Sequence, residues 1–155
     1  MKWLCGVLIS LASLTSLTAC AQTSTMDDSS AFKELADGSC TSAQSRSVEA
    51  HISGQIAALS KQDWESAYSY ASLGFQELVG LDQFIFVITS QYQMLIDSQG
   101  AEFGACTIVN NEINQEVSVT SENQSFELGY SLSYDGKALG IESATTILRE
   151  AETNI

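Results

Sequence analysis

The sequence predicts an α+β domain in which three N-terminal helices pack on a curved, four-stranded antiparallel sheet. Apolar residues recur at helical spacing between residues 41 and 97, and after Gly100 they alternate with polar residues as in half-buried strands. The Asp135-Gly136 pair is typical of a tight hairpin turn. A chain of 155 residues suffices for one packed core, so we expect a single domain over residues 41–150.

Two helices are expected between Thr41 and Gly74. The first carries an apolar stripe at steps of four, four and three residues, formed by Val48, Ile52, Ile56 and Leu59. The second starts near Asp63, whose carboxylate suits the free amides of a first turn, and Gly74 ends it. Its buried side holds Trp64, Ala67, Tyr68 and Ala71. A turn or a single helical turn ending at Gly80 follows.

The stretch from Leu81 to Gly100 allows two interpretations. Its run from Phe84 to Ile88 alone would suit a buried strand. The longer pattern fits a helix from 82 to 97 better, with Asp82 as its cap, and we expect that helix to be deeply buried. The apolar positions of this pattern are Leu81, Phe84, Ile85, Ile88, Tyr92 and Leu95.

Four strands are expected after Gly100. The first runs from about Phe103 to Val109, and the second contains Val117 and Val119. The third places Phe126, Leu128, Tyr130, Leu132 and Tyr134 on one face. The last continues from Leu139 through Ile141, Ser143 and Thr145 to about Leu148.

The first nineteen residues have the form of a signal peptide: a positive start, an apolar stretch too short for a comfortable membrane span, and small residues at the end. Leu17-Thr18-Ala19-Cys20 resembles the lipobox of bacterial lipoproteins, which implies a lipid on Cys20 and firm anchoring to the cell envelope. Ala19-Cys20-Ala21 also fits ordinary cleavage, which would release a secreted or periplasmic protein. Residues 20–40 are interpreted as a lipid-anchored tether. Because Ala21 replaces the Asp that favours inner-membrane retention, the resemblance implies the periplasmic side of the outer membrane in a two-membrane cell.

Two cysteines remain for the domain, Cys40 and Cys106, and outside the cytoplasm such a pair commonly forms a disulfide. Two separate buried thiols are the alternative. No metal site is expected, because His51 is the one histidine and no Cys or His pair has ligand spacing. No cofactor is expected either, since no phosphate-binding glycine loop occurs.

The formal net charge of −13 argues against nucleic acid as a partner and against binding to an anionic membrane surface through the domain itself. The membrane contact that we expect is therefore the lipid anchor at Cys20. Bulk acidity of this kind more often serves solubility than recognition.

Residues 51–92 carry a set of paired residues that resembles the bacterial domain of unknown function 4864 family. The pairs are Gln55-Ile56, Ala58-Leu59, Asp63-Trp64, Ala67-Tyr68, Ala71-Ser72 and Phe75-Gln76. An apolar helix with a tyrosine and an antiparallel meander follow, so the resemblance covers most of residues 43–149. The order of elements is also similar to the nuclear transport factor 2-like (cystatin-like) cone, in which a curved sheet wraps a long helix. That superfamily holds both enzymes and non-catalytic binding or assembly domains, and its cones often form homodimers through the sheet, so fold does not select a function.

Candidate catalytic residues are few. His51 titrates near neutrality but lies at the edge of an apolar stripe, and Asp63, which faces Tyr68 or Tyr70 in the catalytic hypothesis, is already explained as a cap. Asp27-Asp28 would suit calcium, but a solvated charge pair is the ordinary interpretation. We therefore expect no catalytic residues. A candidate pocket for a small apolar ligand is formed by Trp64, Tyr68, Phe84, Tyr92, Phe126 and Tyr130.

Two hypotheses follow for function. The first is an envelope lipoprotein whose domain binds a small apolar ligand or an envelope protein without catalysis. The second is a small isomerase- or hydrolase-like enzyme that uses a carboxylate with a raised pKa in an apolar cone. The sequence favours the first.

Overall fold

The computed structural model describes residues 28–147, and the predicted signal peptide and Cys20 lie outside this range. The described chain forms six helices and one five-stranded sheet. The helices are α1 (Asp28–Ala31), α2 (Ser42–Ser60), α3 (Trp64–Ser69), α4 (Leu73–Leu78), α5 (Leu81–Gln91) and α6 (Gln93–Ile96). The strands are β1 (Gly38–Ser39), β2 (Ser98–Val109), β3 (Glu112–Ser121), β4 (Gln124–Tyr134) and β5 (Leu139–Thr146).

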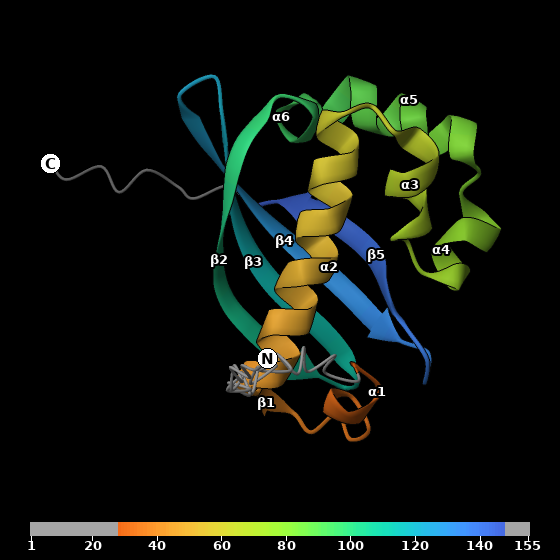
Figure 1. Ribbon diagram of the computed structural model, residues 1–155, viewed down its shortest axis with the longest axis vertical. Helices are drawn as coiled ribbons and strands as arrows, with labels where there is room; N and C mark the ends of the chain where they lie inside the picture. The colour runs from red at the N-terminus through yellow and green to blue at the C-terminus, as the bar shows by residue number, and fades with distance from the viewer. Residues whose placement is uncertain (1–27, 148–155) are drawn as a thin grey trace, which may run out of the picture.

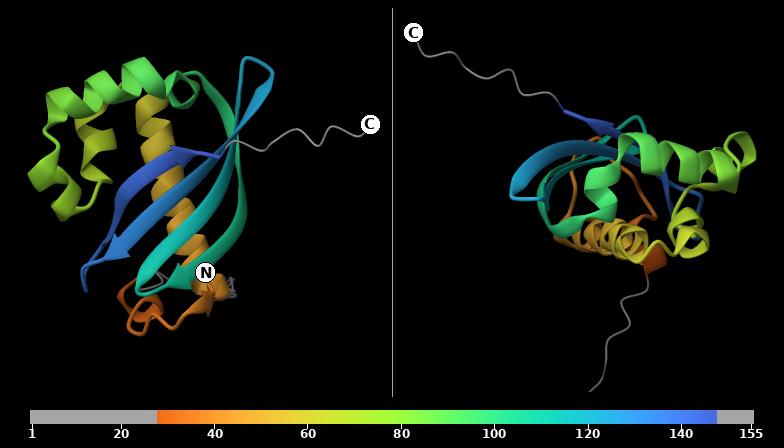
Figure 2. Two further views of the ribbon diagram at one scale, coloured as in Figure 1. Left: turned by 180° about the vertical axis from the view of Figure 1, so that it is seen from behind. Right: turned by 90° about the horizontal axis from the view of Figure 1, so that it is seen from above.

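The sheet has the order β1-β2-β3-β4-β5, and every neighbouring pair is antiparallel. The strands twist around the long helix α2, which crosses one face of the sheet (Figure 1). Seen from behind, the opposite face carries no helix of the described chain (Figure 2). Helices α3, α4 and α5 lie together beyond the β5 edge (Figure 1). The α+β class and the antiparallel meander are confirmed, but the expected three helices and four strands undercount the elements.

Helix α2 forms as predicted because its start and its buried face are both encoded locally. Thr41 and Gln44 make a capping box, in which each side chain bonds the other's backbone amide. The predicted stripe from Val48 to Leu59 is buried. Gly54 lies on this helix against the Tyr70 ring, where a Cβ would clash with the tyrosine.

The second helix is shorter than predicted. It starts after Asp63, whose side chain accepts a hydrogen bond from the Ser66 amide at 3.2 Å, so the predicted cap is confirmed. It ends at Ser69 rather than at Gly74, because the next residues pair with the edge of β5. The Ile141 amide donates a hydrogen bond to the Tyr70 backbone carbonyl, and the Ser72 amide donates one to the Ile141 carbonyl.

Helix α4 then begins at once. Its N-cap is the Ser72 hydroxyl, which accepts from the Phe75 amide at 3.0 Å, so Gly74 lies inside a helix instead of ending one. A Cβ on Gly140 of β5 would meet the backbone of Ser72. The absence of a side chain at that position therefore lets the chain approach the sheet edge closely.

The predicted helix from 82 to 97 is two helices, α5 and α6. The break falls at Tyr92, whose ψ of 37° leaves the helical region. Its hydroxyl donates to the Ala144 carbonyl of β5 at 2.6 Å, which fixes the break against the sheet. Asp82 is not the cap, since Gly80 holds that position without a side-chain bond. The helical interpretation of the Phe84–Ile88 run is confirmed, but the expected deep burial is wrong: on α5 only Phe84 and Ile88 are buried, and Phe86 is 69% exposed because this helix lies beside the sheet edge with one side in water.

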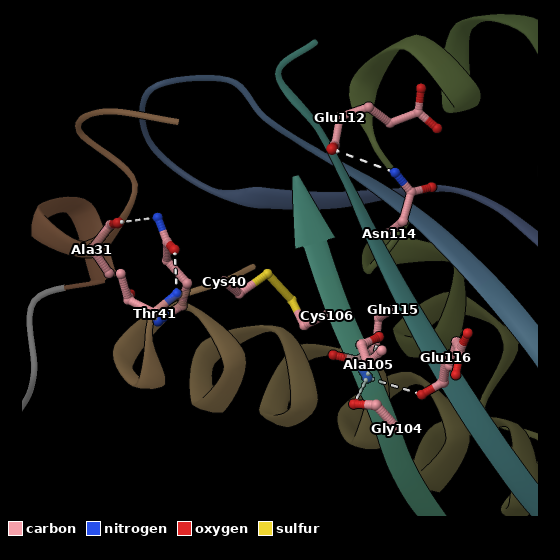
Figure 3. The surroundings of a disulfide bond; sticks show 11 residues. Ala31, Cys40, Thr41, Gly104, Ala105, Cys106, Glu112, Asn114, Gln115 and Glu116 are labelled. Carbon is pink, nitrogen blue, oxygen red and sulfur yellow. Dashed lines mark hydrogen bonds between the residues drawn. A yellow bond between two sulfur atoms is a disulfide. The ribbon is translucent and has the colours of Figure 1, made fainter. Parts of the chain in front are cut away.

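The predicted inward face of β4 is confirmed, and β3 alternates in the same way. Strand β2 differs, because a bulge at Gly104 and Ala105 turns Phe103 and Cys106 toward the core. The buried Gln115 side chain donates to the Gly104 and Ala105 carbonyls at 3.1 and 3.4 Å, so it satisfies backbone groups that the bulge leaves unpaired (Figure 3). A second irregularity near Ile141 shifts the last strand, so Ala144 rather than Ser143 faces the core.

Part of the segment interpreted as a tether packs with the domain. Phe32 is only 3% exposed and stacks on Tyr134, with ring centroids 5.2 Å apart. Gly38 and Ser39 pair with β2, and Cys40 forms a disulfide with Cys106 (Figure 3). The predicted pairing of these cysteines is thus present. The interpretation of residues 20–40 as a tether therefore applies only to the residues before this packed segment.

No helix within residues 28–147 has the length and apolar character needed to span a bilayer.

Candidate ligand cavity

An apolar cavity of about 220 Å³ lies between the helices α4 and α5 and the edge strand β5. Its apolar lining consists of Ala71, Phe75, Val79, Phe84, Val87, Ile88, Leu95, Ile141 and Ala144. Its polar lining consists of Gln55, Gln83, Tyr92, Glu142 and Ser143. An apolar wall with a few polar groups is the usual make-up of a small-molecule site.

The outer wall of the cavity is held in place by Tyr68. The hydroxyl of this α3 residue donates to the Val79 carbonyl at 2.6 Å and lies 3.2 Å from the Gln76 carbonyl. Its ring packs against Phe84, which also meets Phe75 edge to face. Helix α3 thus fixes both α4 and α5 around the cavity, so the wall is built by packing rather than by a loose loop.

Three of the five polar lining side chains, Gln55, Tyr92 and Glu142, are buried or half-buried. Gln55 projects from α2, is 5% exposed, and donates from its Nε2 to the Ala67 carbonyl at 3.4 Å. The hydroxyl of Tyr92 donates to Ala144, which leaves its oxygen lone pairs as acceptors. Glu142 lines the cavity from β5, and its Oε1 accepts from the Ser133 hydroxyl at 2.6 Å.

A hollow of about 400 Å³ on the outer face of the sheet has a different character. Its lining includes Glu112, Asn114, Glu116, Ser131 and Thr145. This surface is polar, as expected for the water-facing side of an antiparallel sheet. We therefore take the cavity beside β5 as the candidate site.

A comparison with protein-family profiles matches residues 41–153 to a domain of unknown function, DUF4864. This match covers well over half of the chain. The chain belongs to the DUF4864 family. No curated protein and no solved structure matches the sequence significantly.

The DUF4864 domain brings together only part of the predicted pocket. Phe84 and Tyr92 line the cavity, and Tyr68 supports it from behind through the Phe84 ring. Trp64 packs against the core from α3 without lining this space. Phe126 lies beside a separate hollow near α6.

Tyr130 does not line the cavity either; it is buried in the sheet core. Its hydroxyl has no hydrogen-bond partner among the described residues. Burial raises its pKa, with a smaller contribution from the nearby Tyr92. Its role in the described structure is therefore packing, and its hydroxyl stays protonated at neutral pH.

The two candidate catalytic side chains are engaged in structure outside the cavity. His51 donates its Nε2–H to the Tyr70 carbonyl at 2.9 Å, and its ring meets Tyr70 edge to face. Asp63 is exposed at the start of α3. Its pKa is lowered from 3.8 by hydrogen bonds from the side chain and then the backbone of Ser66, which is the electrostatic signature of a cap.

Among residues 28–147, no group of three or more histidine, cysteine or acidic side chains is arranged to hold a metal ion. Of the predicted Asp27-Asp28 pair, Asp27 lies outside this range and Asp28 begins α1.

Sequence reasoning missed most of the polar lining of the cavity. Gln55 is not one of the apolar positions from which the first helix was predicted, and Glu142 lies at an irregularity in β5 that no alternation pattern shows. The available signal was Gln55 itself, a polar residue between Ile52 and Ile56, which both belong to the apolar stripe.

Proposed function

We propose that this DUF4864 protein is a bacterial envelope lipoprotein whose domain binds a small apolar ligand, without catalysis, in the cavity beside β5. The observation that carries the binding role is the cavity itself, with an apolar wall and a buried carboxamide. Its volume of about 220 Å³ exceeds the ~150 Å³ of a cavity that accepts benzene. It is smaller than the ~300 Å³ at which pockets for drug-sized molecules begin.

The proposal includes a nuclear transport factor 2-like cone as the frame of the site. Support comes from the meander order of the strands and from α2, which crosses the face that the sheet wraps (Figures 1 and 2). In this arrangement the cavity lies at one side of the wrapped helix, where α4 and α5 close the space next to β5.

The anchoring half of the proposal depends on Cys20. The sequence Leu17-Thr18-Ala19-Cys20 supports an acyl anchor, and the packed segment from Phe32 onward leaves about ten residues between the lipid and the domain. At ~3.5 Å per extended residue, the domain would stand no more than about 40 Å from the bilayer. We place it on the periplasmic side of the outer membrane where a cell has two membranes.

Mass spectrometry of the membrane fraction tests the anchor. The chain expressed in a bacterial host should begin at Cys20 and carry the added acyl mass. A Cys20→Ala variant should leave the membrane fraction while its domain stays folded. A wild-type protein that begins at Gln22, or that is soluble and unacylated, would contradict the anchor and would favour a secreted or periplasmic protein instead.

Calorimetric and thermal-shift titration with ethylbenzene tests the cavity. Binding should raise the unfolding temperature, because the ligand stabilises only the folded state. A Val87→Trp variant should lose binding, since Val87 lines the cavity, and a Thr89→Trp variant on the exposed side of α5 should keep it. Equal binding by both variants would contradict the proposed site.

The enzyme hypothesis keeps one observation in its favour, since Glu142 places a carboxylate at the cavity. Among the described lining residues neither a second carboxylate nor His51 stands beside it. A general base has to stand within hydrogen-bond reach of a substrate proton, and no observation places a substrate proton beside Glu142, so binding is the better-supported function.

A partner protein is the other candidate occupant of this side of the domain. Leu73 and Leu78 on α4 are 67% and 85% exposed, and Phe86 on α5 is 69% exposed. Large apolar side chains in water are typical of interaction surfaces when they cluster. Co-purification from the host envelope, compared between wild type and a Leu78→Ser variant, tests this candidate.

A further inference from the structure

We infer that the ligand of the cavity is a small uncharged molecule that donates a hydrogen bond, such as a phenol or an alcohol, and that Gln55 accepts this bond. This inference rests on the proposed binding function and adds the chemical class of the ligand. It follows from which polar atoms face the cavity and which of them already have partners.

Gln55 is the most deeply buried polar group of the site. Its Nε2 is directed to the Ala67 carbonyl, and none of the described residues donates to its Oε1. A carboxamide oxygen accepts hydrogen bonds, and a ligand that displaces water from this oxygen loses free energy unless it brings a donor of its own. A ligand that brings a donor to this oxygen is therefore favoured over one of equal size that cannot.

Two of the other polar groups of the cavity select in the same direction, whereas Gln83 and Ser143, which are exposed, each carry a donor as well as an acceptor. The Tyr92 hydroxyl donates its proton to the Ala144 carbonyl, so this side chain can only accept a hydrogen bond from the ligand. Glu142 adds a carboxylate at the cavity wall. Together with Gln55, these groups form a set of acceptors.

The charges around the cavity disfavour an anionic ligand. The described lining contains one acidic side chain and no basic one, within a chain of net charge −13. A carboxylate or phosphate held there would lose water without gaining a cationic partner. Fatty acids and other anionic amphiphiles should therefore bind poorly although their apolar parts would fit.

The space itself suits one ring or a short chain. The aromatic side chains Phe75 and Phe84 form part of the wall, and such faces pack well against a flat ring. A substituted phenol fills this volume while its hydroxyl reaches toward the carboxamide at the α2 side.

Four probes with the same ring test the inference by calorimetry on the purified protein at pH 7. These are 4-ethylphenol, 4-ethylanisole, ethylbenzene and 4-ethylbenzoate. We expect 4-ethylphenol to bind about five- to tenfold more tightly than 4-ethylanisole, which keeps the oxygen but lacks the donor. We expect 4-ethylbenzoate, which is anionic at this pH, to bind more weakly than ethylbenzene.

A Gln55→Met variant identifies the acceptor, because methionine keeps the length of the side chain and removes the carboxamide. The phenol-to-anisole preference should fall to about onefold, while ethylbenzene binding is retained. A Gln91→Met variant, on the exposed surface of α5 and outside the cavity lining, should keep the preference and serves as the matched control.

The outcomes separate the inference from the function on which it rests. If ethylbenzene binds but the phenol has no advantage over the anisole, the inference is wrong and the cavity remains a binding site. The same holds if the benzoate binds best. If none of the four probes binds, the proposed function fails together with the inference. Should Gln55→Met fail to fold, the probe order on the wild type decides the chemical class of the ligand, and a Gln55→Leu variant tests the acceptor in its place.

Discussion

Replacing both Cys40 and Cys106 by serine measures how far one covalent bond stabilises the domain. The disulfide joins residues 66 positions apart. Closing a loop of this length removes chain entropy from the unfolded state worth about 4 kcal/mol in the loop-entropy account. The double variant should therefore have a free energy of unfolding lower by about that amount.

The structure also predicts where the variant should loosen first. Strand β1 contributes only Gly38 and Ser39 to the sheet, and the next amide, on Cys40, donates to the Cys106 carbonyl at 3.0 Å. Apart from these bonds, the buried Phe32 ring is the main apolar contact of the segment before α2. Without the crosslink, amide hydrogens at residues 38–40 should exchange faster by a larger factor than those of β3.

Urea unfolding followed by circular dichroism is the assay for the size of the effect. With a urea dependence of about 1–3 kcal/mol per molar for a small domain, the midpoint should fall by about 1.3–4 M. Wild-type protein kept in reductant should behave like the double variant. A fall of less than about 0.3 M, or reduced wild type that stays as stable as the oxidised form, would refute the reasoning.

Three further perturbations test other parts of the structure. Gly140→Ala should destabilise the domain by about 1–3 kcal/mol in urea unfolding, because the added Cβ would meet the backbone of Ser72. Gly100→Ala is the control and should change the stability little, because the space around Gly100 is open. Similar losses in both variants would contradict the packing of the β5 edge. Tyr130→Phe removes a buried hydroxyl without a described partner and should leave the free energy of unfolding unchanged or raise it. Tyr92→Phe loses the hydrogen bond to the Ala144 carbonyl and should lower the free energy of unfolding by about 1 kcal/mol. A larger loss in Tyr130→Phe than in Tyr92→Phe would be inconsistent with the core described above. The pKa of Asp63 lies below 3.8 in the folded state, so the stability that its carboxylate contributes is present above that pH and is lost as the pH falls. Asp63→Asn should therefore flatten the acid limb of a plot of unfolding free energy against pH. An unchanged acid limb would argue against the role of Asp63 as a cap.

The parts of the fold that could be predicted are those in which one periodic pattern runs unbroken. Helix α2 combines a capping residue with four stripe positions, and β4 alternates between buried and half-buried residues from Leu128 to Ser133. In both cases local propensity and burial agree, so the sequence pattern suffices.

The parts that could not be predicted depend on contacts with distant segments. Residues 70–72 leave the helix because β5 offers them backbone partners, and the chain breaks at Tyr92 because its hydroxyl reaches Ala144, 52 positions away. The bulge at Gly104 reverses which side chains of β2 face the core. The helix end, the helix break and the bulge all depend on residues far away in the sequence, so the local pattern of apolar and polar residues does not reveal them.

The candidate site was predictable only to the same degree. Phe84 and Tyr92 were identified as pocket residues because large aromatics on a buried helix often line a cavity. Gln55 and Glu142 come from elements that reach the site through tertiary packing, so their placement needed the structure.

Nuclear Overhauser contacts from bound ethylbenzene give the most direct test of the central claim, which is that the space between α5 and β5 takes up a small apolar molecule. With isotopically labelled protein, the ring protons of the probe should show contacts to the side chains of Phe84, Ile88 and Leu95, all of which line the cavity. Contacts confined to the outer face of the sheet, or none at all at saturating probe, would contradict the claim.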